Sequence, residues 1–139
     1  MEYPGYGVYK NELTDSETLL SNARTVFDFV INDLKYKSEE VFLFGRSMGS
    51  GPACHLASLY EPCGLILLSP YTSLKDVVSS LVGRIPALLV KERFKNAEAI
   101  SKSKCPALII HGLADQLIAS SHSEVLKTKC AGPCTLVIN

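Results

Sequence analysis

Apolar residues recur along the chain in two spacings, one typical of helices and one typical of strands. From about residue 17 to residue 34 they return every three or four positions, which predicts an amphipathic helix. Thr14 and Glu17 stand three residues apart, as the partners of a capping box do, and mark the expected start of this helix. The residues expected to face the core are Leu20, Ala23, Phe27, Val30, Ile31 and Leu34.

Four short apolar runs have the length and composition of β-strands, at 41–44, 65–68, 107–110 and 135–138. Each run is continuous rather than alternating, which is typical of strands that helices cover on both faces. Helical patterns lie between the runs, from a Gly/Ser-rich corner after residue 45 to about Tyr60, and at 73–81, 96–101 and 120–127. The alternation predicts an α/β fold, a parallel sheet of about four strands flanked by helices, in one domain over residues 1–139.

The segment after the first run carries the clearest chemical signal. Ligands of parallel sheets bind at the carboxyl ends of the strands. There the chain reads GRSMG (45–49), a G-x-S-x-G element between a strand and a helix, which is the context of a nucleophile elbow. The flanking glycines let strand and helix approach while the backbone turns sharply, so Ser47 is expected to be strained and exposed. We expect Ser47 to be a nucleophile and the Met48 N–H, at the helix start, to be an oxyanion donor.

Two other interpretations of this segment are possible from its residues. A phosphate cradle at the helix N-terminus is disfavoured, because the segment lacks both the Gly-Lys-Ser/Thr ending of a P-loop and the G-x-G-x-x-G spacing. The plainer alternative is a tight strand-to-helix turn in which glycine and serine serve backbone geometry alone.

A serine nucleophile needs a base, and the base needs an orienting carboxylate. Asp115 follows the run 107–110 and comes later in the chain than Ser47, in the order that one class of Ser-Asp-His triads uses. The alternative for Asp115 is a loop aspartate that caps the next helix. Asp76 and Glu98 lie within helical patterns and are expected to be surface charges.

None of the three histidines is a convincing base. His55 lies eight residues beyond Ser47 along the helix, which is about 12 Å at 1.5 Å per residue. His111 ends a strand ahead of the acid, where a structural role is the expectation, although it is the only internal candidate near the strand ends. His122 opens the helix after Asp115 and is expected to be a cap or a surface residue.

Charge and cysteine content narrow the function classes further. Fourteen Lys and Arg balance fourteen Asp and Glu, so the long-range field that a nucleic-acid partner requires is absent. The chain has five cysteines, an odd number, and their spacing is neither that of a disulfide framework nor that of a zinc site. We therefore expect free thiols in a reducing compartment. No apolar run approaches the roughly 20 residues of a membrane span. We expect a cytoplasmic location, with membrane association as an alternative for the complete protein. We expect neither a metal nor a cofactor.

Four blocks of the sequence together resemble a known family: YPGYG (3–7), FGRSMGSGP (44–52), LSPYTS (68–73) and CPALIIHGLAD (105–115). In this order they are similar to a subgroup of the α/β-hydrolases that includes the α/β-hydrolase-domain palmitoyl-protein thioesterases and the bud-emergence-type hydrolases. The resemblance implies that Ser47 is the nucleophile, that Met48 is an oxyanion donor and that Asp115 is the acid. It also implies that His122 matches a family histidine that is not the catalytic one.

The same resemblance implies that the chain is the carboxyl-side half of a larger, incomplete hydrolase domain. The family's catalytic histidine would fall beyond Asn139, and its first four strands, with the loop that supplies a second oxyanion donor, would precede residue 3. The implied activity is ester or thioester hydrolysis, with acylated protein cysteines as substrate. The strand at 41–44 would then be an open edge, which predicts self-association. The alternative function is a non-catalytic fragment or binding module with the same fold.

Overall fold

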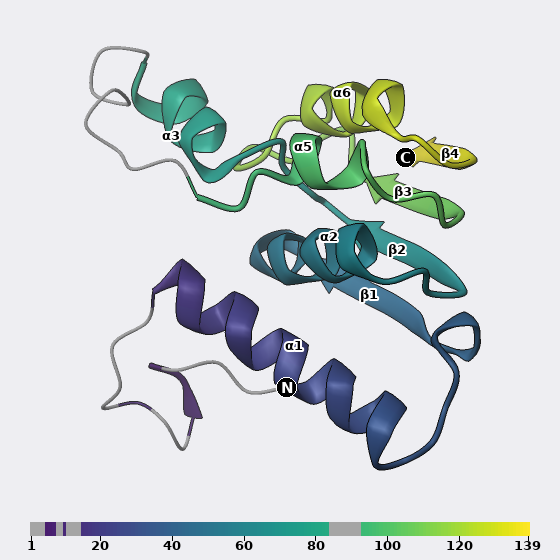
Figure 1. Ribbon diagram of the computed structural model, residues 1–139. Helices are drawn as coiled ribbons and strands as arrows, with labels where there is room; N and C mark the ends of the chain where they lie inside the picture. Colours follow the sequence, from purple (N-terminus) through teal and green to yellow (C-terminus); the bar gives the residue numbers. More distant parts are fainter. Residues whose placement is uncertain (1–4, 8–9, 11–14, 84–92) are drawn as a thin grey trace.

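The computed structural model describes residues 5–7, 10, 15–83 and 93–139. Its centre is a four-stranded sheet in the order β1-β2-β3-β4, and every neighbouring pair is parallel (Figure 1). The strands are β1 (Phe42–Arg46), β2 (Gly64–Leu68), β3 (Ala107–His111) and β4 (Cys134–Ile138). The predicted α/β class with about four parallel strands is confirmed, and each strand lies within two residues of its predicted bounds.

Helices connect the strands in the predicted alternation. The chain forms α1 (Ser16–Asn32), α2 (Ser50–Leu59), α3 (Leu74–Val82), α5 (Asn96–Ile100) and α6 (Ser121–Lys129), with short 3₁₀ turns at Ser38–Glu40 and Ser47–Gly49. No helix of the described residues is long and apolar enough to cross a membrane.

The start of α1 differs from the prediction. Asp15 is the N-cap, and its carboxylate accepts hydrogen bonds from the N–H groups of Glu17 and Thr18 at 2.8 and 3.0 Å. Aspartate is among the strongest N-cap residues, so it satisfies these donors without a capping box. Thr14 lies outside the described residues. The helix ends at Asn32, so Leu34 is exposed, and Leu19 rather than Leu20 is the buried residue of the first turn.

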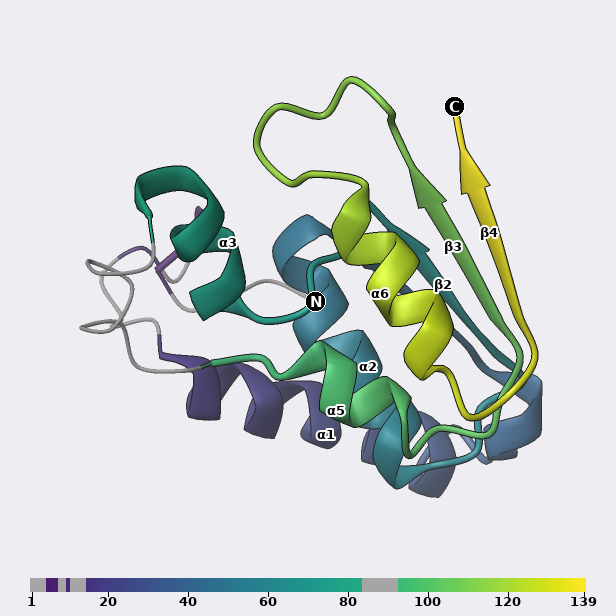
Figure 2. The ribbon, with the colours of Figure 1, turned by 90° about the horizontal axis from the view of Figure 1, so that it is seen from above.

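Helices cover one face of the sheet. Figure 2 shows α1, α2, α5 and α6 on the same side of the strands, where α2 packs on β1 and β2 and α6 packs on β3 and β4. The side chains that point toward these helices form the main core, with Leu65, Leu67 and Ile109 almost fully buried. Burial of this apolar surface is the largest favourable contribution to folding of such a unit.

The other face of the sheet has no helix on it among the described residues, so the expectation of two covered faces is wrong here. Along β1 burial alternates, and Phe42 and Phe44 are 62% and 63% exposed. The strand register places Ile66 beside Phe44, Leu108 beside Ile66 and Thr135 beside Leu108. These side chains point to the same face, because alternate residues of a strand share a side. The continuous apolar runs therefore have apolar residues on both faces, although only one face is covered.

Candidate active site

Ser47 follows β1 directly and has a left-handed backbone, with φ of 48°. Only a few per cent of residues other than glycine adopt positive φ, and such strain gathers at functional sites. Ser47 begins the 3₁₀ turn Ser47–Gly49, which runs straight into α2. The predicted strand-to-helix turn with a strained serine is present. Ser47 is half-buried rather than exposed, which corrects that part of the expectation.

Gly45 explains how strand and helix come close enough for this turn. A Cβ at Gly45 would lie 2.6 Å from the Gly49 carbonyl oxygen and 2.8 Å from the Ala53 Cβ. Real Cβ atoms do not approach backbone oxygens so closely, so any side chain at residue 45 would push α2 away from β1. Glycine at this position is a packing requirement of the turn.

A buried hydrogen-bond network that the sequence did not indicate lies under the turn. The Ser50 hydroxyl donates to the Ser47 carbonyl oxygen at 2.6 Å, and the Asn96 amide nitrogen donates to Ser50 Oγ at 3.0 Å. The same Asn96 nitrogen donates to the Tyr71 carbonyl oxygen at 3.0 Å. Ser50 and Asn96 are almost fully buried. A serine and an asparagine at helix starts read as ordinary caps, so only the tertiary structure reveals their partnership.

Asp115 lies in the loop after β3 and is held mainly by its own neighbours. One carboxylate oxygen accepts hydrogen bonds from the Ile118 N–H at 2.9 Å and the Leu117 N–H at 3.0 Å. The Ser69 side chain, from the loop after β2, also bonds to the carboxylate. The Ile118 N–H is the main cause that lowers the pKa of Asp115 from its ordinary value, since hydrogen bonds to the charged form favour it. Asp115 is thus an anion near neutral pH.

Ser47 and Asp115 lie at the same end of the sheet but not in contact. Ser47 follows β1 and Asp115 follows β3, with β2 between them, so two strand spacings of about 4.8 Å separate their strands. A triad places an imidazole between its serine and its acid, so the two do not need to be in direct contact. The predicted nucleophile and acid therefore lie at the same end of the sheet without a direct hydrogen bond between them.

His111 cannot be that imidazole, because both of its ring nitrogens are engaged. Nε2 lies 2.8 Å from the Ile118 carbonyl oxygen, which can only accept, so Nε2 carries the proton. Nδ1 lies 2.6 Å from Ser123 Oγ and is hydrogen-bonded to that hydroxyl. The distance from Nε2 to the Asp115 carboxylate is 3.7 Å, too long for a hydrogen bond. The ring is fully buried, and its role is structural, as expected from its place ahead of the acid.

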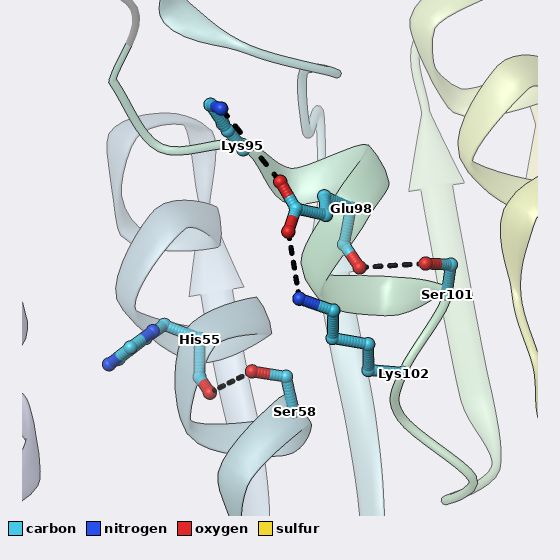
Figure 3. Close-up of polar contacts among 6 residues, drawn as sticks. All are labelled: His55, Ser58, Lys95, Glu98, Ser101 and Lys102. Carbon is cyan, nitrogen blue, oxygen red and sulfur yellow. Dashed lines mark hydrogen bonds and ion pairs between the residues drawn. The ribbon is translucent and has the colours of Figure 1, made fainter.

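The other two histidines also contact neither Ser47 nor Asp115. Figure 3 shows His55 on α2, pointing away from α5, with its backbone carbonyl accepting from the Ser58 hydroxyl at 2.7 Å. His122 is buried, which corrects the expectation of a cap or surface residue. Its Nδ1 lies 2.9 Å from Thr72 Oγ1, and burial is the main cause that lowers its pKa from the ordinary value.

An apolar groove of about 710 Å³ lies beside the open edge of β1 and reaches Ser47. Its walls come from α1, β1 and the start of α2, and include Phe27, Val30, Phe42 and Met48. Three apolar residues lie near Asp115 in the chain. Ile118 is buried, whereas Leu113 and Leu117 are 71% and 60% exposed. Apolar surface near the strand ends is therefore offered by the groove and by these two leucines.

The cysteines are free thiols, and two of them are poor nucleophiles. Burial raises the pKa of the Cys54 thiol and is the main cause that raises the pKa of Cys130 to about 12. Within the described ranges, no three His, Cys, Asp or Glu side chains gather in a way that would hold a metal ion.

Solved structures of other proteins share the fold of this chain. The chain superposes on a crystal structure of an α/β-hydrolase from Vibrio vulnificus with a TM-score of 0.75 at 20% identity, covering 91% of this chain and 50% of that one. It superposes on Est1E from Butyrivibrio proteoclasticus, with ferulic acid bound to that enzyme, with a TM-score of 0.76 at 18% identity, covering 99% and 65%. Both share the α/β-hydrolase architecture.

Sequence similarity identifies the family. Residues 5–99 match the family described as serine aminopeptidase, S33, and the chain belongs to this family of the α/β-hydrolase superfamily. It is 31% identical to the human alpha/beta hydrolase domain-containing protein 17B, covering 95% of this chain and 44% of that protein. It is 26% identical to the alpha/beta hydrolase domain-containing protein aho-3 of Caenorhabditis elegans, covering 93% and 38%. The chain thus spans less than half the length of these relatives.

Proposed function

We propose that this chain carries the nucleophile and the acid of a serine hydrolase that cleaves esters or thioesters. The observation that supports the proposal is the left-handed backbone of Ser47 at a strand-to-helix turn. This turn lies at the end of the sheet that also holds the ionised Asp115. Membership of the α/β-hydrolase superfamily adds weight, because this turn is where its enzymes carry their nucleophile.

The proposed reaction has two halves. Ser47 Oγ bonds to the substrate carbonyl carbon while its proton passes to a base, and the carbonyl oxygen becomes an oxyanion beside the Met48 N–H. Collapse of the oxyanion breaks the bond to the alcohol or thiol, which leaves with the proton from the base. Water then attacks the acyl-enzyme with the same proton transfers, which releases the acid and restores Ser47. Asp115 orients the base and stabilises its protonated form.

The base of this proposal is a histidine from outside residues 1–139. All three histidines of the chain are accounted for: His111 uses both ring nitrogens, His122 bonds to Thr72, and His55 lies eight residues along the helix from Ser47, about 12 Å away. The acylated protein cysteine is the substrate that the resemblance implies, and the apolar surface of Leu113 and Leu117 is suited to an acyl chain. A reducing, cytoplasmic setting fits the five free thiols.

The test is covalent labelling of the 139-residue chain by a fluorophosphonate, read by mass spectrometry, with and without added imidazole. Imidazole supplies the base, and general-base help is worth about 10²- to 10⁴-fold, so labelling should be slow alone and at least about 10-fold faster with imidazole. Ser47→Ala should abolish it. Labelling that persists in Ser47→Ala refutes the nucleophile. No labelling even with imidazole favours the second candidate, a non-catalytic module, which the lack of an internal base supports.

The open edge of β1 supports a further proposal, that the chain self-associates through it. β1 pairs only with β2 among the described strands, and Phe42 and Phe44 are exposed beside the apolar groove. Unpaired edges of this kind accept strands from a second chain. Sedimentation should show concentration-dependent association that Phe44→Lys reduces. A stable monomer at all concentrations contradicts this proposal.

A further inference from the structure

Asn96 is a buried polar side chain that links three segments of the chain. It opens α5 and is 1% exposed, and its amide nitrogen donates to Ser50 Oγ in α2 and to the Tyr71 carbonyl oxygen in the loop after β2. A buried amide is costly unless it is hydrogen-bonded, so these two bonds fix its place. The Asn96 amide thus joins α5 to the base of the serine turn.

The direction of the hydrogen-bond chain follows from the Tyr71 carbonyl. A carbonyl oxygen can only accept, so the Asn96 atom that faces it must be the nitrogen rather than the oxygen. That nitrogen also faces Ser50 Oγ, which is therefore an acceptor there. The single hydroxyl proton of Ser50 is then directed to its remaining partner, the Ser47 carbonyl oxygen at 2.6 Å. Asn96 determines the direction in which Ser50 donates.

The Ser47 carbonyl shares a planar peptide unit with the Met48 N–H. This peptide is trans, so the C=O and the N–H point in opposite directions. A hydrogen bond that holds the Ser47 carbonyl toward the buried Ser50 therefore turns the Met48 N–H the other way, out of the turn. Met48 lies in the first turn of the helical segment, where N–H groups have no partner inside the helix.

We infer that Asn96 is a positioning residue, which acts through Ser50 to hold the Ser47–Met48 peptide so that the Met48 N–H faces the oxyanion. The inference rests on the proposed serine hydrolase function for its chemical meaning. The strain of Ser47 makes such support necessary, since a left-handed serine persists only where its surroundings hold it.

The outer face of α5 supplies a matched control. Figure 3 shows Glu98 paired with Lys95 and Lys102, at 3.9 and 2.7 Å, on the exposed side of this short helix. Glu98→Gln weakens these exposed pairs and leaves the Asn96 amide untouched. Asn96→Asp keeps the size of the side chain but replaces the donor by an acceptor, so the Ser50 hydroxyl can turn toward residue 96 and leave the Ser47 carbonyl held by the Ser50 N–H alone.

The first measurement is amide hydrogen exchange by NMR on the 139-residue chain. The Ser50 N–H bonds back to the Ser47 and Met48 carbonyl oxygens and reports on the turn. Asn96→Asp and Ser50→Ala should each speed its exchange about 10-fold or more, while Ile109 in β3 changes less than about twofold and Glu98→Gln changes neither. Equal acceleration in the turn and in β3 overturns the inference, because it indicates general destabilisation. If Asn96→Asp does not fold, Ser50→Ala carries the test.

The second measurement is fluorophosphonate labelling of Ser47 with imidazole present. Loss of an oxyanion donor costs about 10²- to 10³-fold in other hydrolases, so misplacing one should slow labelling by at least about 10-fold in Asn96→Asp and in Ser50→Ala. The double variant should be no slower than Ser50→Ala, because both act through one bond. Normal labelling in a folded Asn96→Asp protein, or additive losses, overturns the inference. An unlabelled wild type whose Ser50 amide still responds refutes the hydrolase proposal and leaves the Asn96 link standing.

Discussion

The turn after β1 that holds Ser47 (the serine turn) and the loop after β3 that holds Asp115 (the acid loop) lie at the same end of the sheet. They are stabilised in different ways. Ser47 is strained, and its carbonyl is held by Ser50, which in turn depends on Asn96 from a helix 46 residues later. Asp115 instead accepts N–H groups from residues two and three positions ahead, with one further bond from Ser69. The first site relies on tertiary packing, and the second is largely built by its own segment.

The two sites should therefore tolerate substitutions to different degrees. A turn that depends on close approach of a strand, a helix and a buried polar network should respond strongly to one added carbon atom. A loop that caps its own backbone should lose only what its own hydrogen bonds contribute.

The largest contrast is expected between two glycines. Gly45→Ala places a Cβ 2.6 Å from the Gly49 carbonyl oxygen, whereas Gly112→Ala meets nothing within 4 Å. Overpacking of this kind costs about 3 kcal/mol, and a surface change of the second kind stays within about 0.5 kcal/mol. Urea unfolding of the two variants checks this. Equal losses would show that the turn is no more tightly packed than the acid loop.

The next effect concerns Asp115. Asp115→Ala leaves the N–H groups of Leu117 and Ile118 without their carboxylate acceptor. By analogy with helix caps the loss should be about 1 to 2 kcal/mol of unfolding free energy, and Asp115→Asn, which keeps one acceptor oxygen, should lose less. Thermal unfolding of both variants measures the difference. Equal losses in Asp115→Asn and Asp115→Ala would mean that the charge, not the local acceptor, holds the loop.

A smaller effect tests the strain at residue 47. Glycine adopts positive φ without penalty, so Ser47→Gly should be more stable than Ser47→Ala by about 1 kcal/mol. At Ala114 in the acid loop, where φ is not positive, Ala114→Gly should lower stability slightly instead. Chemical denaturation of the three variants decides the matter. If Ser47→Gly is the less stable of the residue 47 pair, the turn is not strained in solution.

The smallest effect is the pH dependence from Asp115. Its pKa is lowered in the folded state, so its contribution to stability is full above the unfolded carboxyl value of about 4 and is lost as the pH falls through the lower folded value. The stability difference between wild type and Asp115→Asn should therefore shrink on acidification. Urea unfolding at pH 6 and pH 3 gives this difference. A difference that grows at pH 3 has the wrong sign for the account.

Structural features that depend on residues close together in the chain could be predicted from the sequence. The four strands, the helices between them and the strained turn at residues 45–49 all follow from local patterns of apolar residues and glycine. The helix start at Asp15 was missed by one residue, because Thr14 and Asp15 both have side chains that can cap.

What the sequence did not reveal depends on packing between distant segments. Nothing local marks Asn96 as a partner of Ser50, or His122 as a buried partner of Thr72, since these pairs are 46 and 50 residues apart. The bare face of the sheet was missed for a related reason. An apolar run shows that a strand has apolar residues on both faces, but it does not show which helices reach each face.

The most direct test of the account is steady-state hydrolysis of a p-nitrophenyl ester by the 139-residue chain, compared with Ser47→Ala and His111→Gln. The chain brings a strained serine and an ionised acid to the same end of its parallel sheet, and none of its three histidines is placed to act as the base. We therefore expect turnover near background for all three proteins, because general-base help is worth about 10²- to 10⁴-fold. Robust turnover by the wild type, lost in both variants, would contradict this expectation and make His111 the base.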